Sequence, residues 1–229
     1  MRYPSRLVEG TLIRRYKRFL CDVELPDGRA FTAHLANTGS MRNCLEDGAA
    51  VRLWDSGNPK RKLPWSVEQI RVGGHWIGVN TARPNAVVAE AIEAGLVPEL
   101  AGYQNLRREV QLGESRIDLC LDDPARCWVE VKNVTLLRSG VLSFPDAVTT
   151  RGSKHVNELA DAVLAGDRAV LFLHIGHEGG ERVTVARDID PVWAAALGRA
   201  LDLGVEVLAY RARMDVDGLW LDRLVPFSM

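Results

Sequence analysis

The chain has 229 residues, of which 47% are apolar and 26% are charged, and its formal net charge is −1. This composition is ordinary for a globular protein, and no apolar run approaches the ~20 residues that a membrane-spanning helix needs. With four scattered cysteines and no hydrophobic run near its start, the chain is expected to be cytoplasmic, with reduced thiols and no membrane association.

Residues 1–80 predict a small β-barrel. Short alternating segments are separated by turn residues such as PDG at 26–28. About five strands in this length, with no long helix between them, are typical of an OB-fold. Another small β-barrel or sandwich would fit the same pattern.

Positive charge is concentrated in this first part of the chain. Residues 1–80 hold 13 Lys or Arg against 8 Asp or Glu, a charge of +5, and residues 81–229 hold 16 against 22, a charge of −6. Two predicted loops mix basic and aromatic residues, RRYKRF at 14–19 and NPKRKLPW at 58–65. Uneven surface charge explains these numbers without a ligand, but loops at these two positions of an OB-fold favour nucleic acid. The candidate nucleic-acid-binding residues of the barrel are Arg14, Lys17, Arg18, Lys60, Arg61 and Lys62.

Residues 81–229 predict a mixed α/β domain. A helix is expected from Pro84 to Gly95, with Asn85 as a possible cap. A second helix over roughly 153–165 is expected to bury Val156, Leu159, Val163 and Leu164. Strands and helices that alternate in this way indicate a central mixed sheet. The other expected elements are strands at 105–112, 115–121, 127–134, 168–175 and 205–213 and a helix at 190–204.

Acidic residues of the first three strands are expected to share one face of this sheet. A two-residue turn between the first two strands places Glu109 opposite Asp118. The next turn places Asp118 opposite or diagonal to Glu130, and Lys132 lies on the same face because side chains alternate along a strand. Such carboxylates suit Mg²⁺ or Mn²⁺. An ion network with arginines of the same strands would fit the same spacing.

Several motifs resemble known families. Asp118 followed by Glu130-x-Lys132 is similar to the signature of PD-(D/E)xK nucleases, although RID stands where PD is expected. Five segments of the chain, found in the same order and spread over nearly its full length, together resemble the sugar fermentation stimulation protein A (SfsA) family. Two positions depart from the pattern of that family: Ala36 stands where proline is expected, and Thr150 where an acidic residue is common. The segments that carry this resemblance are ANTGSM (36–41), GVNTARPN (78–85), REVQLGESRID (108–118), VEVKNVTL (129–136) and FPDAVTTRGSKHVNEL (144–159).

The resemblance implies a DNA-binding protein with two domains. Residues 1–80 would form an OB-like nucleic-acid-binding domain, and residues 81–229 a PD-(D/E)xK nuclease-like domain. Asp118 and Glu130 would be catalytic metal ligands for Mg²⁺ or Mn²⁺, and Lys132 would position or activate water. Glu109 and Glu90 are the candidates for outer or additional metal ligands.

Two further segments are candidate binding sites. Arg151, Lys154 and His155 would line a phosphate path beside the metal, although Lys154 could simply pair with the residue four positions on, Glu158. The segment that holds Asn37, Thr38 and Gly39 is predicted to be a turn in which Gly39 adopts unusual dihedral angles, and it could also contact a ligand.

Three functional hypotheses follow. The first is a metal-dependent nuclease acting on DNA or RNA, with DNA favoured. The second is a sequence-tolerant DNA-binding regulator without catalysis, which the Asp118, Glu130 and Lys132 set argues against. The third is an enzyme of sugar metabolism, for which no glycine-rich cofactor loop or nucleophile elbow is present. The oligomeric state does not follow from the sequence.

Overall fold

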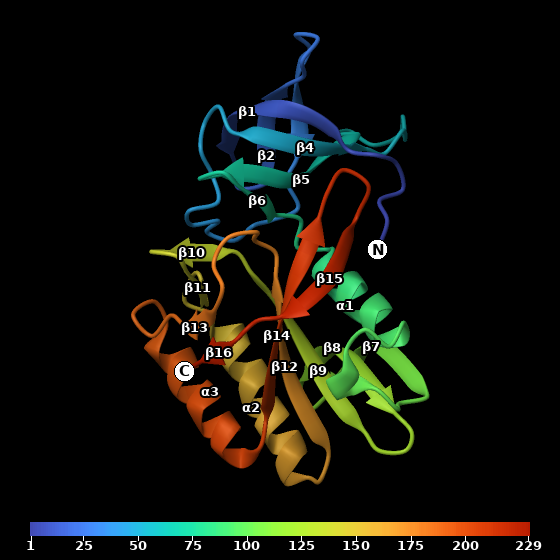
Figure 1. Cartoon of the computed structure of the whole chain (residues 1–229), viewed down its shortest axis with the longest axis vertical. Coiled ribbons are helices and arrows are strands. Elements are labelled where there is room, and N and C mark those ends of the chain that lie inside the picture. Colours follow the sequence, from blue (N-terminus) through green and yellow to red (C-terminus); the bar gives the residue numbers. More distant parts are fainter.

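Six short strands form the first domain, at the top of Figure 1. The sheet order is β3-β2-β1-β4-β5-β6, and the additional pairing of His34 in β3 with Ser66 in β5 closes the sheet into a barrel. Alternate side chains such as Leu12, Val23 and Leu53 fill the interior. The strands are β1 (Val8–Tyr16), β2 (Leu20–Glu24), β3 (Ala30–His34), β4 (Ala50–Asp55), β5 (Trp65–Val72) and β6 (His75–Gly78).

The second domain is built on a mixed sheet in the order β15-β14-β12-β9-β8-β7. Strand β12 runs parallel to both β9 and β14, and the outer pairings are antiparallel. A smaller sheet, β10-β11-β13-β16, which the sequence did not predict, lies beside it. The strands are β7 (Asn105–Leu112), β8 (Ser115–Asp122), β9 (Cys127–Val134), β10 (Leu136–Arg138), β11 (Val141–Phe144), β12 (Arg168–Ile175), β13 (Val183–Val185), β14 (Glu206–Met214), β15 (Leu219–Leu224) and β16 (Phe227–Ser228).

Helices cover both faces of the larger sheet (Figure 1). α1 (Pro84–Glu93) packs on one face against β8, β9 and β15. α2 (Thr150–Leu164) and α3 (Pro191–Leu203) pack together on the other face, where Phe144 and Trp193 meet edge to face. The predicted mixed sheet between helices is therefore confirmed. A short 3₁₀ turn, η1 (Pro98–Leu100), follows α1.

Helix ends differ in detail from the sequence prediction. Asn85 does not cap α1, because the helix begins one residue earlier, at Pro84, and Asn85 lies inside its first turn. The residue at the cap position is Arg83, whose side chain makes no hydrogen bond to the helix. α2 begins at Thr150, earlier than predicted, because the hydroxyl of Thr149 accepts the amide of Gly152 at 2.9 Å. Leu164, expected in the core, is 68% exposed at the last turn of α2.

The two domains meet along β6 and the loop that follows β12. The amide of Gly78 donates to the carbonyl of Gly176 at 2.8 Å, and the amide of Trp76 donates to the Glu178 carboxylate at 2.8 Å. The guanidinium of Arg211, 6% exposed, donates to four successive carbonyls of this loop, from His177 to Gly180. The loop is therefore held rigidly against both domains.

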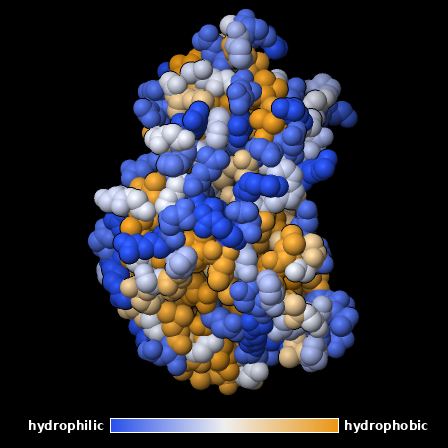
Figure 2. Space-filling model, viewed as in Figure 1, coloured by the Kyte–Doolittle hydropathy of each residue, from blue (hydrophilic) through white to orange (hydrophobic).

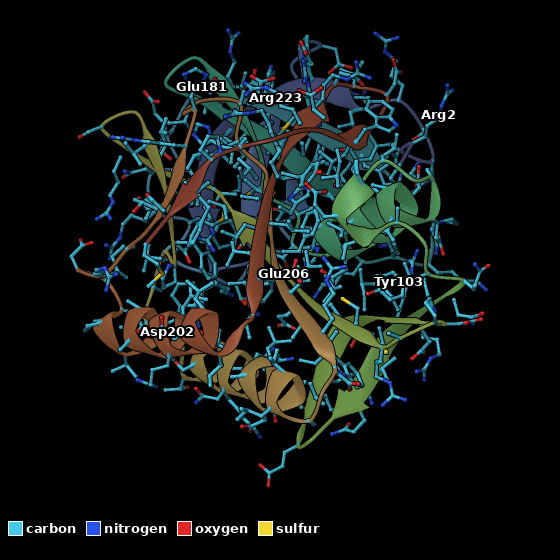
Figure 3. All side chains as sticks on the ribbon, turned by 60° about the horizontal axis from the view of Figure 1, so that its bottom comes forward. Arg2, Tyr103, Glu181, Asp202, Glu206 and Arg223 are labelled. Atoms are coloured by element: carbon cyan, nitrogen blue, oxygen red, sulfur yellow. The ribbon has the colours of Figure 1, made fainter.

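The computed structural model describes residues 1–229. Arg223 of β15 donates to Glu181 at 2.8 Å, and Figure 3 shows both side chains at the same end of the molecule.

Figure 2 shows mostly hydrophilic residues over the barrel, with larger hydrophobic areas on the second domain. None of the helices is both long enough and apolar enough to span a membrane.

Candidate metal and nucleic-acid site

A cavity of about 460 Å³ lies where the two domains meet, and both contribute to its walls. Most of its lining is polar. The lining residues are Asn37, Thr38, Gly39, Thr81, Pro84, Asn85, Asp118, Glu130, Val131, Lys132, Asn133, Thr135, Asp146, Arg151 and His155.

Glu130 of β9 is the most buried acid of this cavity, with 2% exposure. Its Oε1 accepts from Lys132 Nζ at 2.5 Å and contacts His155 Nδ1. Burial alone would raise the pKa of Glu130, but the hydrogen bond from His155 and the attraction of Lys132 outweigh it, and the pKa is lowered. Its other oxygen, Oε2, is buried and has no hydrogen-bond partner in the protein.

Asp118 reaches the same cavity from the neighbouring strand, β8. Its Oδ1 accepts from Asn85 Nδ2 at 2.6 Å, and its Oδ2 accepts from the amide of Val131 at 2.8 Å. Burial, together with repulsion from Glu130, raises the pKa of Asp118 to about 6. The structure thus brings together Asp118, Glu130 and Lys132, as the strand register predicts.

This pair of carboxylates fits a hard divalent cation. A buried carboxylate oxygen without a partner, Glu130 Oε2, is costly unless something else satisfies it, and a cation would do so. The protein contains no group of three or more His, Cys, Asp or Glu side chains arranged to hold a metal ion. The side chains present would therefore offer two carboxylates to a divalent cation.

His155 lies beneath Glu130, 4% exposed, on the first turns of α2. Arg151 Nε donates to His155 Nε2 at 3.3 Å. Because Nε2 accepts this bond, Nδ1 carries the proton and donates to Glu130 Oε1. Arg151 also lines the cavity, where its charge faces the space beside the two carboxylates.

Lys154 lies apart from its two neighbours in the candidate set. Its Nζ pairs with Glu114 at 2.9 Å on the exposed surface, and Lys154 is not part of the cavity lining. The alternative pairing with Glu158 is not formed; Glu158 instead accepts the amide of Glu114 at 3.2 Å. Lys154 is therefore a surface residue of α2 that pairs with the turn between β7 and β8.

Asn37, Thr38 and Gly39 reach the cavity from the barrel. Asn37 Oδ1 accepts the amide of Gly39 at 2.9 Å, so the segment is a tight turn. The prediction for Gly39 is wrong, since it does not adopt a positive φ; left-handed residues follow at Met41 and Asn43 instead. What favours glycine is space, because an added Cβ would lie 3.0 Å from Asn37 Oδ1.

Glu109 and Glu90 lie outside the cavity. The ladder pairs Arg108 with Leu119 and Val110 with Ile117 but leaves Glu109 unpaired, with φ +54 and an exposed side chain. Glu109 therefore keeps its position between these pairs but does not line the cavity. Glu90 on α1 pairs instead with the N-terminal amine of Met1 at 2.9 Å. Neither residue is included in the proposed ligand set.

Comparisons with known proteins agree with this two-domain arrangement. Residues 13–79 match the model of the SfsA N-terminal OB domain, and residues 82–218 match the model of the sugar fermentation stimulation protein RE domain. The chain belongs to the SfsA family. Its second domain is accordingly a restriction-endonuclease-like domain.

SfsA relatives match over nearly the whole chain. The sugar fermentation stimulation protein homolog of Rhodospirillum centenum is 51% identical, covering 100% of this chain and 100% of the relative. The homolog of Geobacter sulfurreducens is 50% identical over 97% of each chain. The solved structure of Pyrococcus furiosus SfsA in complex with Ca²⁺ shares the fold, with a TM-score of 0.89 and 24% identity over 100% of this chain and 98% of that one.

The basic residues of the SfsA OB domain lie outside the cavity. β1 extends to Tyr16, so Arg14 belongs to the strand rather than to the loop, and it pairs with Asp22 at 2.8 Å. Lys17 and Arg18 form the exposed β1–β2 turn, with φ +47 and +66. Lys60, Arg61 and Lys62 lie in the loop between β4 and β5. The guanidinium carbon of Arg61 lies over the ring of Trp54, 5.8 Å from the ring centre.

Other residues of the SfsA site were not predicted from the sequence. Asn85 stands in one of the segments that resemble the family, but the sequence predicted it only as a helix cap. In the structure its side-chain amide donates to Asp118. Asp146 stands in another family segment and accepts from Ser40 of the barrel at 2.7 Å. No local pattern indicates these contacts, because each joins segments far apart in the chain. The remaining unpredicted lining residues are Thr81, Pro84, Val131, Asn133 and Thr135.

Proposed function

We propose that this SfsA-family protein is a divalent-metal-dependent nuclease that hydrolyses phosphodiester bonds in nucleic acid, with DNA favoured. The observation that carries the proposal is the convergence of Asp118, Glu130 and Lys132 in one cavity, where Glu130 Oε2 is buried without a partner. A sheet that needed only structural support would not require this arrangement.

Asp118 and Glu130 would hold Mg²⁺ or Mn²⁺. When bound, the cation supplies Lewis acidity to the attacking water and to the phosphate oxygens. Asn85 and the amide of Val131 fix the orientation of Asp118, and His155 fixes that of Glu130. These contacts keep both carboxylates in place before substrate arrives.

Lys132 is the proposed residue that acts on the reacting groups. Its side chain is 19% exposed and its ammonium lies 2.5 Å from Glu130 Oε1, so it faces the cavity beside the carboxylates. From there it can donate to the attacking water or to a non-bridging phosphate oxygen, where negative charge develops.

The surrounding residues would bind the rest of the substrate. Arg151 carries a positive charge at the cavity, and Asn37 and Thr38 offer polar groups from the opposite wall. Lys17 and Arg18 of the β1–β2 turn, together with the basic loop of residues 60–62, would add phosphate contacts outside it.

The relative from Pyrococcus furiosus adds support for the metal, because it was solved in complex with Ca²⁺. Ca²⁺ is a hard cation that prefers oxygen ligands, as Mg²⁺ and Mn²⁺ do. A cation of this class is what two adjacent carboxylates suit.

The second candidate function is a DNA-binding regulator without catalysis, acting on genes of sugar metabolism. The observation that favours it is the closed network in which Lys132 and His155 both bind Glu130 Oε1. In that case Lys132 stabilises the fold and has no chemical role.

Incubation of the pure protein with labelled DNA and RNA, single- and double-stranded, tests the proposal. Reactions would contain Mg²⁺, Mn²⁺ or a chelator. Cleavage that requires metal supports the nuclease. The absence of cleavage in every reaction, with binding retained, supports the regulator.

A further inference from the structure

We infer that the substrate is single-stranded nucleic acid, which runs from a platform formed by Phe19 and His34 on the barrel into the cavity between the domains. This inference rests on the proposed function and names its substrate class. Single-stranded DNA and RNA share the required chemistry, a flexible charged backbone with bases free to stack.

The barrel segment 36–44 forms one wall of the cavity and is anchored at both ends. Near its start, the carbonyl of Ala36 accepts from the hydroxyl of Thr81 at 2.8 Å. Near its end, Ser40 donates to Asp146 at 2.7 Å and the side chain of Asn43 donates to the carbonyl of Leu137 at 3.2 Å. The segment therefore ties the two domains together across the site.

This anchored wall limits what can reach the carboxylates. Glu130 is 2% exposed, and the cavity above it measures about 460 Å³. A space of this size takes one drug-sized unit such as a nucleotide. A single strand or a frayed end can place one nucleotide in a space of this size, whereas the nucleotides of an intact duplex are held in base pairs.

Arg15 connects the β1–β2 turn with this wall. Its Nε donates to the carbonyl of Arg18 at 2.8 Å. Its Nη2 donates to the carbonyls of Asn37 at 3.0 Å and Gly39 at 3.2 Å. The backbone of the β1–β2 turn is thus tied to the segment that lines the cavity, and the exposed side chains of Lys17 and Arg18 extend from this turn.

An aromatic surface lies at the outer end of this path. Phe19 is 44% exposed, and its ring centre lies 6.4 Å from that of His34. His34 ends β3, two residues before the anchored segment begins. An exposed aromatic ring between basic residues and a polar cleft is the arrangement on which successive unpaired bases stack.

Fluorescence anisotropy in the presence of a chelator tests this inference on the full chain. The probes are labelled single-stranded DNA, single-stranded RNA of the same sequence, and the blunt DNA duplex. We expect at least one single strand to bind at least about tenfold more tightly than the duplex. The DNA and RNA arms show which polymer is preferred.

Phe19→Ala should weaken binding of the preferred single strand by about 5- to 100-fold and leave duplex binding unchanged. Phe19→Trp, which keeps a stacking surface, should restore it. Leu203→Ala is the matched control, since Leu203 is 43% exposed at the end of α3 and does not line the cavity. Equal affinity for duplex and single strand, or an equal loss for both with Phe19→Ala, would overturn the inference.

The cleavage assay separates this inference from the proposed function. If blunt duplex is cut as fast as single strand, the inference fails and the nuclease stands. If single strand binds selectively through Phe19 but no nucleic acid is cut, the nuclease fails and the single-strand path stands.

Discussion

Asn85 donates from Nδ2 to Oδ1 of Asp118 at 2.6 Å, which places a residue of the first turn of α1 in direct contact with a proposed metal ligand on β8. The other oxygen of Asp118 is held by a backbone amide. Both oxygens are therefore oriented by the protein, and α1 contributes to the site although none of its own acids lies there.

Asn85→Ala is expected to reduce Mn²⁺ affinity by about 10- to 100-fold, the usual effect of removing a group that orients a ligand. Calorimetric titration with Mn²⁺ measures it. Asn105→Ala changes the same residue type at an exposed position of β7 and should bind as the wild type does. Wild-type affinity in Asn85→Ala would show that Asp118 does not depend on this contact.

Asp118→Asn and Glu130→Gln should each abolish or strongly weaken Mn²⁺ binding, because a neutral amide is a poor ligand for a hard cation. Both changes keep the side-chain shape, and melting temperatures check that the variants fold. Glu109→Gln and Glu90→Gln remove the same charge outside the cavity and should leave the affinity unchanged. Unchanged binding in both of the first pair would exclude this metal site.

Replacing Lys17 and Arg18 by Ala together should weaken nucleic-acid binding and make its salt dependence shallower. The logarithm of the binding constant falls linearly with the logarithm of the salt concentration. Each lost phosphate contact reduces the magnitude of this negative slope by about 0.7 for single strands and about 0.9 for duplex. Arg187 and Arg199, two exposed arginines of the second domain, provide the control with the same loss of charge. If the affinities and slopes of both double variants equal those of the wild type, the β1–β2 turn does not contact the backbone.

Two buried histidines predict a loss of stability in acid. Burial lowers the pKa of His174 to about 4, and burial with repulsion from His75 and Arg211 lowers the pKa of His177 to about 4. Between their ordinary pKa of 6.5 and about 4, the unfolded chain binds protons that the folded protein does not bind. The free energy of unfolding therefore falls as the pH is lowered across this window, by up to about 3 kcal/mol per histidine.

Chemical denaturation between about pH 7 and about pH 4.5 measures this loss. His174→Asn and His177→Asn preserve hydrogen-bonding groups near the ring Nδ1 positions, which contact Asn133 and Gly179. The double variant should show a smaller decrease in the free energy of unfolding between these two pH values than the wild type shows. An unchanged dependence would show that other groups, such as the carboxylates, account for the acid sensitivity.

Much of the site's core follows from local rules. Strand alternation and short turns place Asp118 and Glu130 side by side, and the structure has the register that those rules give. At Glu109 the flanking pairs keep the predicted register, but Glu109 itself has a positive φ, is left out of the ladder and does not line the cavity. A charged residue with positive φ inside a strand gives no signal in the sequence.

Contacts between distant segments could not be predicted in the same way. The wall formed by Asn37 to Gly39 depends on how the barrel docks on the second domain, through pairs such as Ser40 with Asp146, which lie 106 positions apart. Asn85 looks like a helix cap by its place after proline. Its side chain instead donates to Asp118, because the folded sheet places a partly buried acceptor within reach.

Lys132→Met gives the most direct test of the nuclease, because the chemical and structural roles of this lysine predict different results in one preparation. The measurement is metal-dependent cleavage of labelled nucleic acid, made together with the melting temperature and Mn²⁺ titration of the same sample. The nuclease account predicts a near-normal melting temperature, retained Mn²⁺ binding and loss of cleavage. A lowered melting temperature with cleavage preserved in the folded fraction, or a wild type that cleaves nothing, would contradict it.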